Sequence, residues 1–176
     1  MKFTKTLILL SGILLFSNLY ATAETYESRY TPLSAAKCIT LHEEQDFILQ
    51  ECPGFAGYQL HVSEGDLRQS ITLVRDGKEH PLQFWDTVSP LFSTLGTKAE
   101  WRFIANNRKL SPIALITRLN VVTGEKADQT TSWLVVTKIT MSSICVVGKI
   151  RPQRDGTQNQ KARDMADKST DMACLK

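Results

Sequence analysis

The chain has 176 residues, of which 42% are hydrophobic, 22% charged and 8% aromatic. This length and composition fit one domain with a hydrophobic core, and they exclude a disordered chain, a collagen-like repeat and two ordinary domains. The formal net charge of +3 is too small to indicate a nucleic-acid-binding protein, and no dense row of basic residues is present to follow a phosphate backbone.

The N-terminal segment has the pattern of a secretory signal peptide. Two lysines precede an apolar run over residues 6–16, and Ala21 and Ala23 form a small-residue cleavage site. The alternative is a membrane anchor, but an apolar run of about 11 residues is shorter than the roughly 20 that cross a bilayer. We therefore expect residues 1–23 to be removed and residues 24–176 to form a single domain without stable membrane insertion.

The four cysteines of the mature part predict two disulfides, because an even number in an exported chain is typical of an oxidising compartment. Four cysteines can pair in three ways. Residues 37–52 alternate on either side of a polar centre and predict a hairpin, which would bring Cys38 and Cys52 together. The second bond would then join Cys145 to Cys174. A zinc site is the alternative, but the cysteines and histidines lack the close spacing that zinc ligands need, so we expect no metal.

The other expected elements follow in chain order. Residues 24–36 are an extended lead-in, and residues 81–97 are a loop with one short helical turn. Strands are expected at 58–62, 67–74, 99–105, 112–122, 131–140 and 144–150, the last four forming an antiparallel meander. Residues 158–174 suit a helix, because small and apolar residues recur at three- and four-residue spacing. Trp85, Trp101 and Trp133 are expected in the core.

Together these elements predict an α+β domain, mostly an antiparallel β-sheet made of a hairpin plus a four-strand meander, with a C-terminal helix and two disulfides. No phosphate-binding glycine loop, nucleophile elbow or zinc-protease motif is present in the sequence, so we expect no cofactor.

Two groups of residues are candidates for a ligand site. Glu64, Asp66 and Arg68 fall at a turn, where two carboxylates and a guanidinium could face a ligand, or could simply form an ion-paired turn. Arg102 and Arg118 are the second group. With Glu100 opposite Arg118 they would form a cross-strand ion pair; the functional alternative is a pair of arginines that binds an anion through bidentate hydrogen bonds.

Short motifs run through nearly the whole mature chain, among them Cys52-Pro-Gly54, Gly57-Tyr58, Ser63-Glu-Gly-Asp-Leu-Arg68, Glu100-Trp-Arg102 and Cys145-Val-Val-Gly148. In this order they resemble a group of small exported proteobacterial proteins of unknown function. The resemblance implies a bacterial source, export and two disulfides, and it carries no activity, cofactor or site.

Export without a catalytic motif favours a non-enzymatic binding or interaction module, periplasmic or secreted, whose partner is a protein or an envelope ligand and not a nucleic acid. Two alternatives stay open. One is an envelope-directed hydrolase with Glu64, Asp66 and Arg68 at its site. The other is an inhibitor of a hydrolase, which rests on analogy between small disulfide-bonded β proteins.

Overall fold

The computed structural model describes residues 25–106 and 109–176, and the predicted signal peptide lies outside this part of the chain. In the described part, ten strands belong to one mostly antiparallel sheet. The strands are β1 (Tyr26–Pro32), β2 (Ile39–Glu44), β3 (Phe47–Phe55), β4 (Tyr58–Gly65), β5 (Arg68–Arg75), β6 (Lys78–Pro81), β7 (Ser93–Asn106), β8 (Lys109–Val122), β9 (Thr130–Ile139) and β10 (Ile144–Ile150). The helices are α1 (Phe84–Thr87) and α2 (Gln158–Ala166), with short 3-10 helices η1 (Ala35–Lys37) and η2 (Ser169–Asp171).

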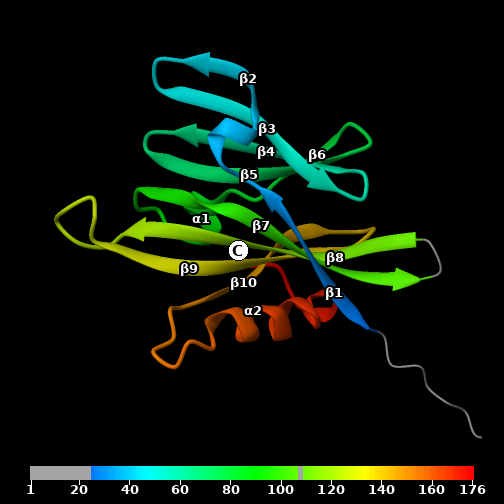
Figure 1. Ribbon diagram of the computed structural model, residues 1–176. Helices are drawn as coiled ribbons and strands as arrows, with labels where there is room; N and C mark the ends of the chain where they lie inside the picture. The colour runs from blue at the N-terminus through cyan, green and yellow to red at the C-terminus, as the bar shows by residue number, and fades with distance from the viewer. Residues whose placement is uncertain (1–24, 107–108) are drawn as a thin grey trace, which may run out of the picture.

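The sheet divides into two halves, β2 to β6 in the upper part of Figure 1 and β7 to β10 below them. Its order is β10-β9-β8-β7-β5-β4-β3-β2, with β6 added beside β5 and β1 beside β7. The halves meet where β5 and β7 run parallel, and the register there holds a single residue pair, Arg68 with Ser93. Because β10 also approaches β6, the sheet curls around a central core.

The central core lies between the two halves of the curled sheet. Trp101 of β7 is fully buried in it, and its indole nitrogen donates a hydrogen bond to the Thr31 hydroxyl over 2.9 Å. The rings of Phe55 and Tyr58 lie 6.0 Å from the Trp101 ring, a separation typical of tilted aromatic pairs. Trp133 packs against this core only in part, whereas Trp85 is 39% exposed, so the expectation of three core tryptophans is wrong for Trp85.

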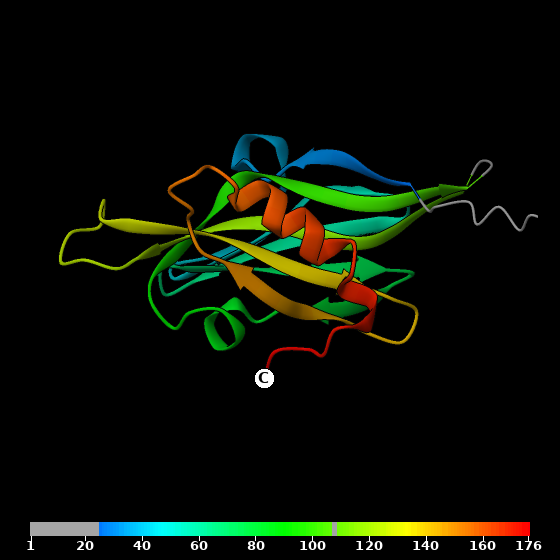
Figure 2. The ribbon, with the colours of Figure 1, turned by 90° about the horizontal axis from the view of Figure 1, so that it is seen from below.

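A second apolar layer lies on the outer face of the sheet, where α2 crosses β8, β9 and β10 (Figure 2). Ala162 and Ala166 of α2 are fully buried against this face. Gly148 of β10 lets the helix approach closely, because a Cβ atom there would lie 2.4 Å from the Met165 sulfur. Small residues on both α2 and β10 therefore allow the helix to lie close to the sheet. The polar residues of α2 lie at the border of this contact.

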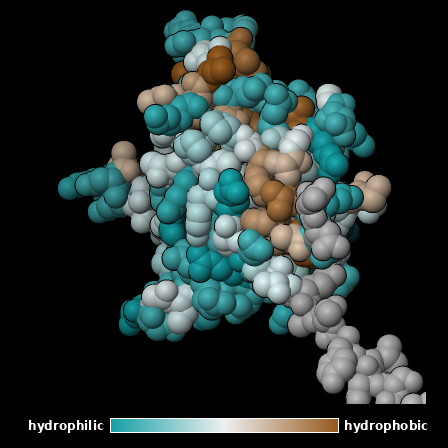
Figure 3. Space-filling view, turned by 45° about the vertical axis from the view of Figure 1, so that its right-hand side comes forward, coloured by the Kyte–Doolittle hydropathy of each residue, from teal (hydrophilic) through white to brown (hydrophobic). Residues whose placement is uncertain are grey.

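Both disulfides join the predicted cysteines. The Cys38–Cys52 bond closes the β2–β3 hairpin, and the Cys145–Cys174 bond ties the C-terminal tail to β10. The tail adds a backbone hydrogen bond from Leu175 to the Val146 carbonyl over 2.8 Å, so it covers part of the β10 edge. The β2 edge is exposed along its whole length, and Figure 3 shows hydrophobic side chains gathered over that end of the molecule.

The sequence predicted the main strands better than their number and limits. The hairpin, the four-strand meander β7 to β10 and the helical turn at α1 are confirmed. The sheet is larger than a hairpin plus a meander, since the extended lead-in pairs with β7 as β1 and residues 78–81 pair with β5 as β6. The expected helix over 158–174 ends at Ala166, because Ser169 turns inward to contact the Ile113 carbonyl and the tail must return to β10.

In the described ranges, no helix is both long enough and apolar enough to cross a membrane.

Candidate functional site

The structure brings Glu64, Asp66 and Arg68 together at the turn between β4 and β5. The turn places Asp66 and Leu67 at positive φ, a geometry that matches the twist of a two-residue hairpin. An Arg68 Nη1 proton is donated to Asp66 Oδ2 over 2.6 Å, and the Arg68 Nε group donates to the Pro90 carbonyl over 2.8 Å. Glu64 accepts a hydrogen bond from the Gln69 amide over 2.6 Å.

A hollow of ≈ 530 Å³ lies beside this turn, with a lining made of Gln45, Asp46, Phe47, Ile48, Glu64, Asp66 and Leu67. The Asp66 side chain is 73% exposed, so water screens its ion pair with Arg68. Arg68 does not line the hollow and already donates to two acceptors. The geometry is that of an ion-paired turn, the structural alternative for these residues.

Arg102 fastens the end of α2 to the sheet. Its Nε and Nη2 groups donate to the two carboxylate oxygens of Asp167 over 2.8 and 2.7 Å, and its Nη1 group donates to the Ser28 hydroxyl over 2.7 Å. The Arg102 side chain is 10% exposed. All three donor nitrogens of the guanidinium are therefore engaged within the protein, and Arg102 is a clamp between β7 and α2.

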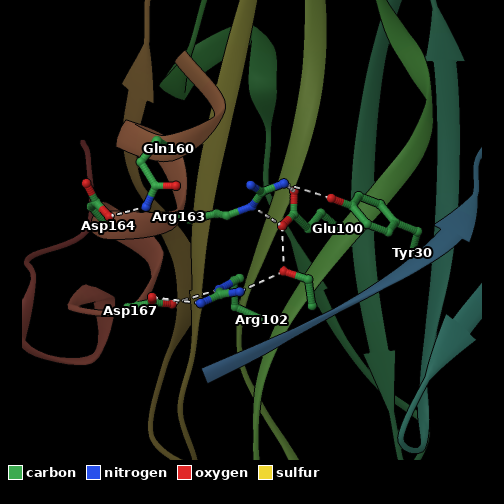
Figure 4. Close-up of polar contacts among 8 residues, drawn as sticks. Tyr30, Glu100, Arg102, Gln160, Arg163, Asp164 and Asp167 are labelled. Atoms are coloured by element: carbon green, nitrogen blue, oxygen red, sulfur yellow. Dashed lines mark hydrogen bonds and ion pairs between the residues drawn. The ribbon is translucent and has the colours of Figure 1, made fainter. Parts of the chain in front are cut away.

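Glu100, two residues before Arg102 on the same face of β7, forms a second clamp with α2 (Figure 4). Its carboxylate accepts hydrogen bonds from Arg163 Nε and from the Ser28 hydroxyl, each over 2.6 Å, and Arg163 Nη2 donates to the Tyr30 hydroxyl over 2.9 Å. Burial alone would raise the pKa of Glu100. The hydrogen bonds and the positive charge of Arg163 outweigh that effect and hold the pKa below its ordinary value.

The expected pairing of Glu100 with Arg118 is not observed. The register places Ile116 opposite Glu100, and it shifts between Leu95 and Ala99 so that Arg118 lies beside a bulge. Gly96 makes this bulge fit, because a Cβ atom there would lie 2.8 Å from the Cβ of Arg118. A glycine inside a strand is a recognised sign of a bulge. The missing pair has another cause, the position of the turn: Asn106 pairs with Lys109, whereas Glu100 opposite Arg118 would need a register two positions further along β8.

Arg118 instead points toward the start of α2. Its Nη1 group donates to the Ser132 hydroxyl over 2.8 Å and to the Gln158 side-chain oxygen over 3.3 Å. These partners are neutral, and within residues 25–106 and 109–176 Arg118 forms no ion pair with a carboxylate. The guanidinium is therefore held in place by hydrogen bonds while its positive charge is left without a counter-charge.

Arg118 lines a hollow of ≈ 290 Å³ between the β7 bulge and α2, which we call the β7–α2 pocket. Its lining consists of Tyr30, Gly96, Thr97, Lys98, Glu100, Ile116, Arg118, Leu134, Asn159 and Arg163. Three cations and one carboxylate are present, which leaves two positive charges in excess. Arg163 is neutralised by Glu100, so the excess charge belongs to Lys98 and Arg118. The Lys98 ammonium lies 4.7 Å from the centre of the Tyr30 ring and, in the described part, pairs with no carboxylate.

The sequence indicated Arg118 as a candidate but missed its companions in the pocket. Tyr30 lies in what looked like a simple lead-in, and Lys98 lies between the expected loop over 81–97 and the expected strand over 99–105. Asn159, Arg163 and Asp167 recur every four residues, which places them on one side of a helix, beside the apolar stripe. That spacing was the available signal for a polar rim along α2, although it does not show which strand the rim would meet.

No group of three or more histidine, cysteine or acidic side chains within the described ranges is arranged to hold a metal ion. Comparison of the chain with protein-family models, with curated proteins and with solved structures finds no match. The features that bear on function are therefore the chemistry of the β7–α2 pocket and the two disulfides.

Proposed function

We propose that this protein is an exported, non-enzymatic binding module, periplasmic or secreted, and that its β7–α2 pocket binds an anionic group. The observation that carries the proposal is the pair Lys98 and Arg118, two cations that line one pocket and have no carboxylate partner among the described residues. An anion entering the pocket would supply the missing counter-charge and accept hydrogen bonds from groups that are already oriented.

The framework of the pocket supports binding in preference to catalysis. Glu100 and Arg163 neutralise each other, and the low pKa of Glu100 keeps it ionised near neutral pH, where it cannot donate a proton. Both clamps, Glu100 with Arg163 and Arg102 with Asp167, hold α2 in position. The two ion pairs therefore fix the wall of the pocket and the positions of its charged groups, as a binding site for an anion requires.

Export is supported by the leader pattern over residues 1–23 and by two disulfides of the kind that persist in oxidising compartments. Expression of the full chain in a bacterium with cell fractionation tests this part of the proposal. We expect the protein outside the cytoplasm, with Glu24 as its first residue and no thiol that reacts after unfolding. A protein that keeps its leader, or that has four reactive thiols, would contradict export.

Anion binding is tested by NMR titration of the mature chain at constant ionic strength with sulfate, phosphate, acetate and hexanoate. We expect at least one anion to shift the amide signals of Gly96, Lys98 and Asn159 in a saturable way, and Arg118→Gln to remove the saturation. Arg154→Gln is the matched control, because it removes the same charge from an exposed position that does not line the pocket. If Arg118→Gln and Arg154→Gln reduced the saturable shifts equally, or if no anion gave saturable shifts, a specific anion site in this pocket would be refuted.

A further inference from the structure

The β7–α2 pocket is not uniformly polar. Ile116 and Leu134 line it beside the cations, and each keeps only a small exposed fraction, 3% and 6%. An inorganic oxyanion would pair with the charged groups and make no apolar contact with these two side chains. A ligand that joins a negative charge to a hydrocarbon part would use both surfaces.

The free part of Arg118 favours a planar anion. Its Nη1 group is engaged by Ser132 and Gln158, and no acceptor in the described part of the chain takes the protons of Nε and Nη2. These two groups form the edge of the guanidinium that binds both oxygens of a carboxylate in parallel. Arg163 presents the same kind of edge to Glu100 through Nε and Nη2, so a carboxylate geometry of this type already exists at the pocket wall.

Size and charge restrict the ligand further. A volume of ≈ 290 Å³ suits a small organic molecule rather than a folded partner. With Arg163 neutralised, the two remaining cations fit a ligand with one or two negative charges. Tyr30 is 44% exposed at the rim and carries Lys98 on its ring, so the ammonium is placed to meet a ligand at the entrance.

We infer that the β7–α2 pocket binds a small organic carboxylate with an apolar body, its carboxylate on Arg118 and its hydrocarbon part against Ile116 and Leu134. This inference rests on the proposed anion-binding function and specifies the ligand class of the same site. It differs from that proposal in requiring a carboxylate and an apolar group together.

Isothermal calorimetry and NMR with the unaltered mature chain test the inference through a ligand series. The series is acetate, butanoate, hexanoate, the neutral hexanamide, and sulfate. We expect hexanoate to bind about tenfold or more tightly than acetate, because burying even two methylene groups gives that factor. Hexanamide should show no saturable binding, because it cannot supply the counter-charge, and sulfate should bind more weakly than hexanoate.

Two variants connect the binding to named side chains. Arg118→Gln keeps a polar group near Ser132 and should remove the preference for hexanoate over hexanamide. Lys98→Gln changes an exposed residue, so it should leave the fold intact; we expect it to weaken hexanoate binding several-fold and reduce its dependence on salt. Circular dichroism of each variant checks that the fold is retained. The ligand series on the unaltered protein tests the inference even if a variant fails to fold.

The outcomes separate this inference from the proposal beneath it. Tight sulfate or phosphate binding that depends on Arg118, without any effect of chain length among the carboxylates, would overturn the carboxylate assignment and leave the anion site standing. Absence of saturable binding by every anion in both titrations would overturn both. Hexanoate binding that Arg118→Gln does not change would place the ligand elsewhere and also overturn the inference.

Discussion

Replacing Glu100 with glutamine removes the charge that holds Arg163 while leaving nearly the same shape. The Glu100 side chain is 11% exposed and its Arg163 partner 32% exposed, so water screens the pair only in part. Hydrogen bonds to charged groups contribute about 1.5–3 kcal/mol, and exposed ion pairs contribute about 0.2–1 kcal/mol. For this partly buried pair we expect the free energy of unfolding to fall by about 2 kcal/mol, which corresponds to about 4–8 °C in Tm for a domain of this size.

The loss should depend on pH with a defined sign. The pKa of Glu100 is lower in the folded protein than its ordinary value, so the unfolded chain binds the proton more readily. The contribution is therefore complete above the ordinary pKa of the carboxyl group and disappears as the pH falls through the lowered folded value. The difference between the unaltered protein and Glu100→Gln should be largest near neutral pH and should shrink in acid.

Urea unfolding followed by tryptophan fluorescence, repeated from pH 7 into the acid range, measures both quantities. Arg163→Gln and the double variant complete a cycle that isolates the coupling between the two side chains. Asp66→Asn is the matched control, because it breaks the exposed pair with Arg68 and should cost less than about 1 kcal/mol. Parallel pH curves for Glu100→Gln and the unaltered protein, or an equal loss in Asp66→Asn, would refute the reasoning about the clamp.

Three further changes test the packing and the covalent framework by thermal or urea unfolding. Trp101→Ala should cost about 3–5 kcal/mol, because it empties a fully buried site in the central core; a loss below 1 kcal/mol would contradict that placement. Gly54→Ala should be much more damaging than Gly57→Ala. A Cβ at Gly54 would lie 1.7 Å from the Tyr58 carbonyl oxygen, whereas nothing lies within 4 Å of one at Gly57. Because Gly57 has a positive φ, its replacement by alanine should still lower the free energy of unfolding by about 1 kcal/mol. Equal losses of stability in the two variants would show that the backbone at Gly54 does not lie against the Tyr58 carbonyl. Cys174→Ser should lower stability by about 3–4 kcal/mol, because the bond closes a loop with a sequence separation of 29; an unchanged urea midpoint would show that the tail contributes nothing.

The sequence was most informative where a local pattern decides the structure. Alternating apolar residues gave the meander, and the hairpin around residues 42–46 correctly predicted the Cys38–Cys52 bond. Strands without a strong alternating pattern were missed, because pairing with a neighbour decides whether they form. Polar residues of β1 become a strand because β7 offers a partner edge, and residues 78–81 do so because β5 is adjacent.

The pocket was out of reach for a different reason. It joins β1, β7, β8, β9 and α2, and the hydrogen bond between Arg163 and Tyr30 links positions separated by 133 in sequence. The hairpin pairs Asn106 with Lys109, and this register places Ile116 rather than Arg118 opposite Glu100; a difference of two positions changes which charges meet across two strands. Arg118 therefore lies two positions beyond Ile116, beside the bulge at Gly96, and lines the pocket.

One wall of the pocket comes from α2, which is synthesised after every strand that it contacts. The sheet residues around it are complete before α2 exists, and the helix is then held by two ion-paired clamps and followed by a tail that the Cys145–Cys174 bond fastens to β10. A chain cut short before residue 158 would keep the ten described strands and lose the α2 wall of the pocket. Formation of the strands and completion of the pocket are therefore separate steps in making the protein, and a measurement of strand content follows only the first.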